Sequence, residues 1–215
     1  MILYDATDLS NGLMQQAHIA YKGNNRVPAV GDDKYERYLA IANRLIRMWA
    51  KDPVVKWSSL WTEIDLDTVI TIDVQAYDFE TSVMRVSDNV YLTDGAGGAK
   101  VDEYHVYKPQ ERDIHGSKVC YVTGVAPLRL NFNDDIDADF PHLGKTIQVA
   151  VYNTPDALED ETDAIPVDNP DWLVYALAAE LARNDPAKED QFPNLIGLAN
   201  EEYRRMVDGN ILSPY

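Results

Sequence analysis

The hydrophobic positions near the start of the chain repeat with the period of an α-helix. One continuous face is formed by Tyr35, Tyr38, Leu39, Ala42, Leu45, Ile46 and Trp49. Asp32 and Asp33 precede this segment, and Asp52-Pro53 follows it, as expected at the two ends of a helix. A shorter segment, which contains Leu9, Leu13, Met14 and Ala17, has the same spacing and ends near Gly23. The pattern predicts two helices within residues 1–56.

From about Trp57 to Tyr152 the hydrophobic period changes to two, which is typical of strands. The runs rich in β-branched and aromatic residues are 61–66, 69–72, 83–86, 90–92, 101–107, 119–122, 128–132 and 147–151. Turn sequences with glycine, aspartate and proline separate them. The segment 113–116 between two such runs is predicted to be the tip of a hairpin.

The last third of the chain returns to helical spacing. Asn169-Pro170-Asp171 combines a capping residue, a proline at the first helical position and an acid near the positive end of the helix dipole. Apolar residues fill one helix from Trp172 to Leu181 and a second from Leu195 to Met206. Residues 211–215 are apolar and are predicted to lie outside any helix.

These patterns predict an α+β fold in which the N-terminal and C-terminal helix pairs form one helical bundle. An antiparallel β lobe, made of many short strands with short connections, is expected to be inserted between them. The expected division is a helical domain of residues 1–56 and 165–210, a β domain of residues 57–164, and a C-terminal tail of residues 211–215.

Composition narrows the range of partners and compartments. The 215 residues include 36 Asp and Glu against 19 Lys and Arg, which gives a net charge of −17. This balance argues against wrapping of nucleic acid through phosphate contacts and against docking on anionic lipid. The single cysteine, Cys120, excludes an internal disulfide and a thiolate zinc site. No apolar run approaches the ~20 residues needed to span a bilayer, and the N-terminus does not resemble a leader, so we expect a soluble protein of a reducing compartment.

Motifs for catalysis or cofactor binding are weak. The four histidines, at positions 18, 105, 115 and 142, are scattered and have no partner at helical spacing. Gly144-Lys145-Thr146 resembles the end of a phosphate-binding loop, but Asp139 stands where that loop requires glycine. The glycine-rich segment 94–98 precedes no helical pattern, so it is not a dinucleotide fingerprint. We therefore expect no enzymatic activity, no cofactor and no metal.

Acidic residues are concentrated in the second half of the chain. Residues 131–190 contain 15 acidic and 3 basic residues, so −12 of the net −17 lies there. An EF-hand beginning at Asp135 would need glycine at 140 and glutamate at 146, where the chain has Phe140 and Thr146. A calcium loop of another kind within 133–139 and a simple solvated acidic face both stay open.

Two segments of the C-terminal third resemble head–tail adaptor (connector) proteins of tailed bacteriophages. They are Leu158-Glu-Asp-Glu-Thr-Asp163-Ala-Ile165-Pro166, and Pro170-Asp171-Trp172-Leu173 with the alanine-rich run 176–182. In that family a strand and a Thr-Asp-x-Ile-Pro-type loop lead into an alanine-rich helix. Earlier segments follow a similar order: Tyr104-His-Val-Tyr107-Lys-Pro109, Tyr121-Val-Thr-Gly124 and Leu128-Arg-Leu-Asn-Phe132.

The resemblance implies a structural virion protein, made in the host cytoplasm and located at the head–tail interface. It implies a ring, usually of twelve copies, that binds the portal protein and a tail or nozzle protein. Double-stranded DNA would pass through the ring without specific binding, and no membrane is involved. The residues expected to line the channel are Asp134, Asp135, Asp137, Asp139, Asp160, Glu161 and Asp163. Ile211, Leu212 and Tyr215 are expected to dock on the portal or on a neighbouring adaptor.

The alternative is a calcium- or carbohydrate-binding β module of a virion or cell-surface assembly. Tyr91, Tyr104 and Tyr107 would stack on sugar, and the carboxylates of 133–139 would hold the ion. The flanking helices have no role in this alternative. The sequence leaves both functions open.

Overall fold

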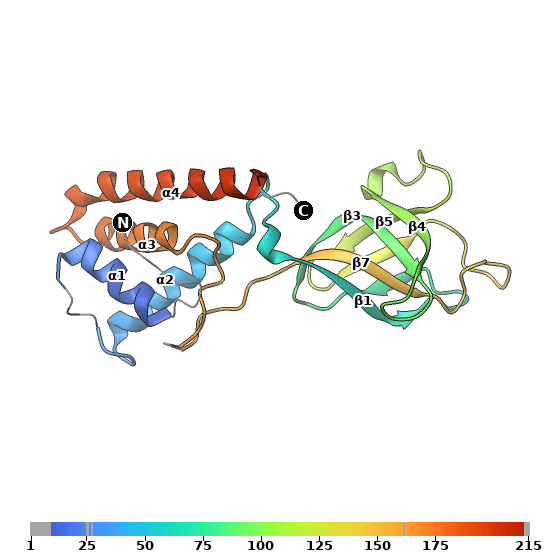
Figure 1. Ribbon diagram of the computed structural model, residues 1–215, viewed down its shortest axis with the longest axis horizontal. Coiled ribbons are helices and arrows are strands. Elements are labelled where there is room, and N and C mark those ends of the chain that lie inside the picture. The colour runs from blue at the N-terminus through green and yellow to red at the C-terminus, as the bar shows by residue number, and fades with distance from the viewer. Residues whose placement is uncertain (1–9, 25, 27, 161, 213–215) are drawn as a thin grey trace. The chain divides into compact units, whose positions relative to one another are not determined.

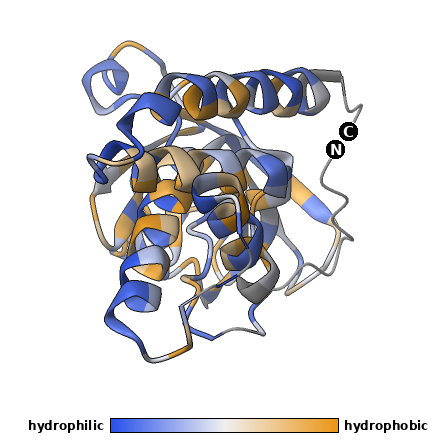
Figure 2. Cartoon of the chain, turned by 90° about the vertical axis from the view of Figure 1, so that its left-hand side faces the viewer, coloured by the Kyte–Doolittle hydropathy of each residue, from blue (hydrophilic) through white to orange (hydrophobic). Residues whose placement is uncertain are grey.

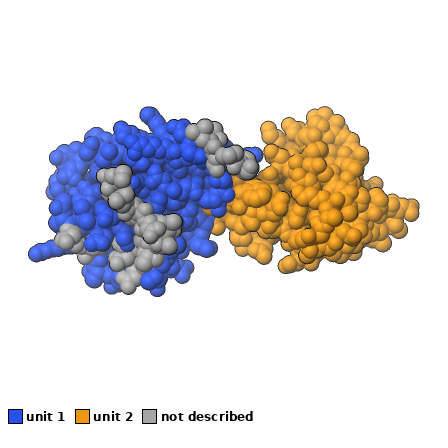
Figure 3. Space-filling view, in the orientation of Figure 1, with its two compact units in different colours: residues 1–59, 155–215 blue, residues 60–154 orange. Residues whose placement is uncertain are grey.

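The computed structural model describes residues 10–24, 26, 28–160 and 162–212. The chain divides into two compact units, coloured separately in Figure 3. Residues 1–59 and 155–215 form the first, which we call the helical unit, and residues 60–154 form the second, the strand unit. Each unit has buried hydrophobic residues of its own.

The helical unit contains helices from both ends of the chain (Figure 1). They are α1 (Ser10–Lys22), α2 (Asp33–Ala50), α3 (Pro170–Arg183) and α4 (Phe192–Leu212). Figure 2 shows both hydrophobic and hydrophilic residues on the helices of this unit. The seven residues of the predicted face of α2 are all buried, so the helix predicted there is confirmed.

Helix α3 is the centre of the helical unit. It packs against α1, α2 and α4, and Leu173, Val174 and Leu177 are completely buried. Asn169 caps its start, because its side-chain oxygen accepts a hydrogen bond of 3.1 Å from the backbone nitrogen of Asp171. The alanines of α3 suit a helix that is buried on most sides, because small side chains allow neighbouring helices to approach closely.

An aromatic cluster joins α2 to the C-terminal helices. The ring of Trp49 stacks on that of Trp57 at 5.3 Å between centroids, and Trp57 meets Tyr203 edge-on at 5.9 Å. Trp172 contacts the same tyrosine at 5.8 Å. The sequence led us to expect that Leu45, Trp49, Trp172 and Leu181 are buried, and all four are at most 8 % exposed.

The strand unit consists of a seven-stranded sheet. Its strands are β1 (Trp61–Val69), β2 (Ala76–Asp78), β3 (Val83–Thr93), β4 (Lys100–Tyr107), β5 (Val119–Gly124), β6 (Leu128–Phe132) and β7 (Thr146–Asn153). They lie in the order β1-β7-β3-β4-β5-β6-β2, and the sheet curls into a nearly barrel-shaped form (Figure 1). Strand β7 lies between β1 and β3 and pairs with both of them.

The predicted hairpin at 113–116 is wrong, because β4 and β5 run parallel. Val106 pairs with Cys120, and Tyr107 with Tyr121. Parallel neighbours cannot be joined by a tight turn, since the chain has to return to the starting end of the first strand. The connection therefore runs through a short helix, η2 (Pro109–Glu111), and a further loop.

The predicted fold class is also wrong. The sheet is mixed rather than antiparallel, and strands dominate the core of the protein, so a helical bundle with an inserted β lobe does not describe it. A cluster of fifteen buried residues fills the inside of the sheet, among them Val90, Leu92, Leu130 and Val149. The sequence pattern identified strands one at a time, but it carried no information on which strands pair or on how far the sheet curls.

Two short helices, η1 (Ser58–Leu60) and η3 (Glu189–Gln191), complete the described elements. Helix α4 continues to Leu212, so the prediction that residues 211–215 lie outside any helix is wrong for the first two of them. Among the described residues, no helix has the combination of length and apolar character needed to cross a bilayer.

Candidate functional site

The acids predicted to line a channel belong to two different units. Asp134, Asp135, Asp137 and Asp139 follow β6 in the strand unit, and Asp160 and Asp163 precede α3 in the helical unit. Glu161 lies outside the described residues. The predicted docking residues lie at the end of the chain. The structure describes only the backbone of Ile211 and Leu212, and Tyr215 lies outside the described residues.

The acids that follow β6 have separate partners within the strand unit. A carboxylate oxygen of Asp134 accepts a hydrogen bond of 3.2 Å from the backbone nitrogen of Lys118, and one of Asp135 accepts a bond of 3.2 Å from the Gln75 amide. Asp137 accepts from the backbone of Asp139 at 2.9 Å. No cluster of three or more ligating side chains suited to a metal ion occurs in the part of the chain that is described. The calcium alternative gains no support from this arrangement.

The tyrosines considered for sugar stacking already have contacts within the chain. Tyr104 is buried, and the ammonium of Lys100 lies 3.5 Å from the ring centroid of Tyr91. The ring of Tyr107 stacks on His115 with 3.8 Å between centroids. These contacts do not favour a sugar platform on the strand unit.

The acidic loop before α3 is fastened to α2 by one side chain. The amide nitrogen of Asn43 donates to the carbonyl of Leu158, and its oxygen accepts from the Leu158 nitrogen, both at 2.8 Å. Further along, the carboxylate of Asp163 accepts from the backbone nitrogens of Glu159 and Asp160 at 2.6 and 2.7 Å. These hydrogen bonds hold the pKa of Asp163 below its ordinary value. Asp163 is therefore ionised at neutral pH, and its carboxylate serves to bind the backbone of Glu159 and Asp160.

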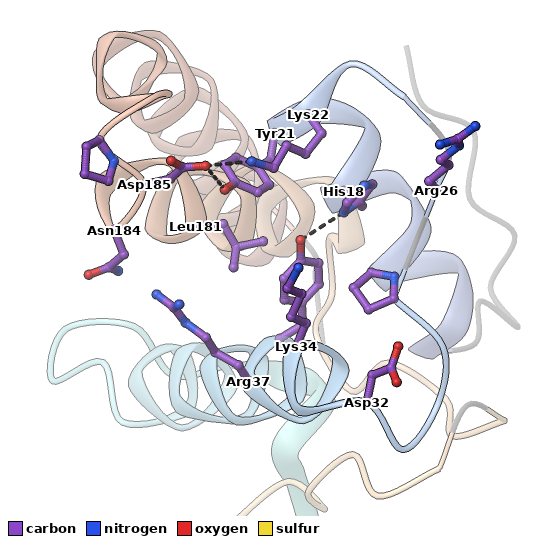
Figure 4. Close-up of a pocket in the computed structure, with 13 residues that line it drawn as sticks. His18, Tyr21, Lys22, Arg26, Asp32, Lys34, Arg37, Leu181, Asn184 and Asp185 are labelled. Atoms are coloured by element: carbon purple, nitrogen blue, oxygen red, sulfur yellow. Dashed lines mark hydrogen bonds and ion pairs between the residues drawn. The ribbon is translucent and has the colours of Figure 1, made fainter.

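The helical unit contains a basic pocket that the sequence did not lead us to predict. It has a volume of about 450 Å³ and lies between α1, the connection to α2, α2 itself and the end of α3 (Figure 4). Its cationic lining residues are Lys22, Arg26, Lys34 and Arg37. Residues 20–60 contain eight basic and four acidic residues, a net charge of +4 within a chain of −17. The rest of the chain therefore carries −21.

Asp185 organises one wall of this pocket. Its carboxylate accepts from the ammonium of Lys22 at 2.6 Å and also from the hydroxyl of Tyr21. Figure 4 shows both side chains reaching from α1 to this acid. The hydrogen bond from Lys22, followed by that from Tyr21, holds the pKa of Asp185 well below its ordinary value, and the pKa of Lys22 rises to about 12. Asp185 and Lys22 thus neutralise each other.

The floor of the pocket contains a buried histidine without charge at neutral pH. Nδ1 of His18 and the hydroxyl of Tyr38 are 2.9 Å apart. Burial lowers the pKa of His18 and raises that of Tyr38 to about 12. This pair therefore supplies neutral hydrogen-bonding groups, not charge.

The remaining cations of the pocket have no neutralising partner among the described residues. Within the described residues, no carboxylate forms an ion pair with Arg26, Lys34 or Arg37. Figure 4 shows Arg37 extending from α2 toward Leu181 and Asn184, whereas Arg26 lies beyond His18 and points away from them. The pocket is therefore a concave, positively charged site that favours an anionic ligand.

Comparison with known proteins adds no family to this description. A scan of the sequence against models of known protein families found no match, and a search of curated proteins found no significant match.

Proposed function

We propose that the protein is a structural virion component, a head–tail adaptor that forms a ring between the portal and the tail and continues the DNA channel. One observation carries the proposal: of the two segments that resemble adaptor proteins, the second forms the central helix of the helical unit, and the first is attached to α2 through Leu158. Leu158, at the start of the first segment, is buried and bound by Asn43. The second segment forms α3, the helix that packs against the other three.

The position of these segments gives the resemblance weight. Residues that determine packing are constrained by their neighbours, whereas surface residues vary with little effect on stability. Leu173, Leu177 and Ala178 of the second segment are completely buried. A resemblance that rests on such residues supports a related arrangement of the helices around α3.

Exposed apolar side chains supply candidate contacts for a ring. Adjacent subunits of a ring use two different surfaces of each subunit. Val54 is 86 % exposed and Met48 63 % in the helical unit, and Val125 is 91 % exposed in the strand unit. In the proposed assembly such residues bind neighbouring copies or the tail protein, and Ile211, Leu212 and Tyr215 bind the portal or a neighbouring adaptor.

The charge of the chain suits a passage for DNA. Twelve copies of a subunit of charge −17 would bring on the order of two hundred negative charges together. Carboxylates within a Debye length of about 8 Å of the duplex would repel its phosphates and prevent it from adhering. We assign this role to Asp134, Asp135, Asp137 and Asp139, and to Asp160, Glu161 and Asp163.

Removing the gene from the phage that encodes this chain tests the proposed function. Without an adaptor the portal offers no docking surface for the tail, so lysates should contain DNA-packed heads without tails. Supplying the intact gene in trans should restore tailed particles. Normal yields of infectious tailed particles without the protein would reject the proposal.

A second experiment tests only the channel. Asp134→Lys together with Asp135→Lys should slow DNA ejection from otherwise complete particles, most strongly at low salt, because attraction to phosphate replaces repulsion. Asp113→Lys, at an exposed acid of the connection between β4 and β5, is the matched control. Equal ejection rates for both variants would leave the adaptor function intact and reject these residues as channel lining.

A further inference from the structure

We propose that the pocket of the helical unit binds a small phosphomonoester, that is, an organic molecule with a terminal phosphate dianion. This site is independent of the adaptor function, and it rests on the charge, the hydrogen-bonding groups and the size of the pocket.

The charge of the lining matches a dianion. Lys22, Arg26, Lys34 and Arg37 contribute four positive charges, and Asp32 and Asp185 contribute two negative ones. His18 adds none at neutral pH, since burial lowers its pKa. The net charge of the lining is therefore +2. A phosphomonoester carries close to −2 at pH 7, whereas a carboxylate and each phosphodiester of DNA carry −1.

The two cations of α2 have suitable geometry for phosphate. Lys34 and Arg37 are one helical turn apart on α2, which places them on the same side of the helix. The guanidinium of Arg37 presents parallel N–H donors that fit two phosphate oxygens, and the ammonium of Lys34 supplies a compact charge. Of the two acids in the lining, Asp185 already accepts hydrogen bonds from Lys22 and Tyr21, so it does not need these groups.

The pocket is larger than a phosphate ion and is partly apolar. Its volume of about 450 Å³ lies in the range of sites for small organic molecules. Leu181, Pro28 and Pro186 line it together with the rings of Tyr21 and Tyr38. These surfaces fit the organic part of a phosphomonoester, and inorganic phosphate would leave them uncovered.

Calorimetric titration of the full-length chain at low ionic strength tests the proposal. The probes are phenyl phosphate, glycerol phosphate, inorganic phosphate and a short DNA duplex, with chloride as the reference anion. We expect saturable binding of one phosphomonoester per chain, tighter than that of inorganic phosphate. The duplex should bind at least tenfold more weakly per site, because its diesters carry single charges and cannot enter the pocket end-on.

Substitutions assign the binding to the pocket. Lys34→Ala with Arg37→Ala should weaken phosphomonoester binding at least tenfold. Arg47→Ala is the matched control, because Arg47 is exposed on the same helix and does not line the pocket. Asp185→Asn should strengthen binding several-fold, since it removes a negative charge and releases Lys22. Circular dichroism of each variant establishes that the helices are intact.

Three results would overturn the proposal. The first is the lack of saturable binding by either phosphomonoester. The second is equal affinity of the wild type, the Lys34/Arg37 double variant and the Arg47 variant. The third is preferential binding of the duplex, which would identify the basic segment as a surface for DNA.

Discussion

Asp185 shows how one residue links helices from opposite ends of the chain. It lies just after α3, and both of its side-chain donors, Lys22 and Tyr21, belong to α1. Lys22 is 33 % exposed at its side chain, so the ion pair is reached by solvent and its strength depends on hydrogen bonding more than on burial.

The pKa of Asp185 predicts a pH dependence of stability. Because that pKa is depressed in the folded protein, the contribution of the carboxylate is present above the unfolded pKa of about 4 and is lost as the pH falls through the folded value. Asp185→Asn should therefore lower Tm at pH 7, and the difference from the wild type should shrink from about pH 5 toward pH 2. Thermal melts across this range check it, with Asp190→Asn in η3 as control. A Tm difference that does not change with pH would contradict this role.

Asn43 is the second residue whose effect can be predicted. Asn43→Ala removes both hydrogen bonds to the backbone of Leu158 and leaves two partly buried groups without a partner. We expect a loss of about 1–3 kcal/mol in the free energy of unfolding. Urea denaturation measures it. The control is Asn200→Ala, at an exposed position of α4, which should change stability by less than about 0.5 kcal/mol. Equal effects of the two substitutions would rule out the proposed fastening of the loop.

At the level of elements, α3 depends on its cap. Asn169→Ala removes the hydrogen bond to the Asp171 nitrogen and should cost about 1 kcal/mol. Asn169→Ser keeps a capping oxygen but loses the 3.1 Å bond to Glu202, so it should recover most of the loss. Denaturation of the two variants distinguishes these contributions. If the serine variant is as unstable as the alanine variant, the contact with Glu202 is the important one.

The reactivity of Cys120 measures how readily the strand unit opens. It lies in β5, is completely buried, and burial raises the pKa of its thiol well above the ordinary value. We expect no reaction with Ellman's reagent in the native protein and complete reaction in denaturant, because only an exposed thiolate reacts. Rapid modification under native conditions would show that β5 opens readily.

Local signals explain which elements were predictable. The hydrophobic face of α2 and the Asn169-Pro170 start of α3 are local sequence signals, because each depends only on residues close together in the chain. Both helices are found where they were predicted. Strand β2 was missed because Ala76–Asp78 is too short to show alternation. The parallel pairing of β4 with β5 and the curl of the sheet depend on contacts between distant segments, so single-strand patterns could not predict them.

The basic pocket was missed for a related reason. The positive net charge of residues 20–60 is visible in the sequence, but its significance depends on the approach of Leu181 in α3 and of Asp185, which follows that helix. The acids of 133–139 were visible as a group, yet the structure gives several of them separate hydrogen-bond partners. Charge along the chain therefore indicates where charged side chains occur, but only the fold shows which of them are neutralised.

For the whole molecule, the uneven charge is the feature that joins the two proposals. A net charge of +4 over residues 20–60 coexists with −12 over residues 131–190. In the proposed ring the acidic residues face the duplex, and the basic pocket holds a small phosphomonoester. Each role can fail without the other, because they involve different residues and different experiments.

The central claim is that this chain forms a ring at the head–tail vertex. Cryo-electron microscopy of complete virions of the phage that encodes the chain tests it most directly. The account predicts a closed ring of identical copies, usually twelve, between the portal and the tail, with the DNA path through its centre. Absence of the chain from the particle, or its location away from this vertex, would contradict the account.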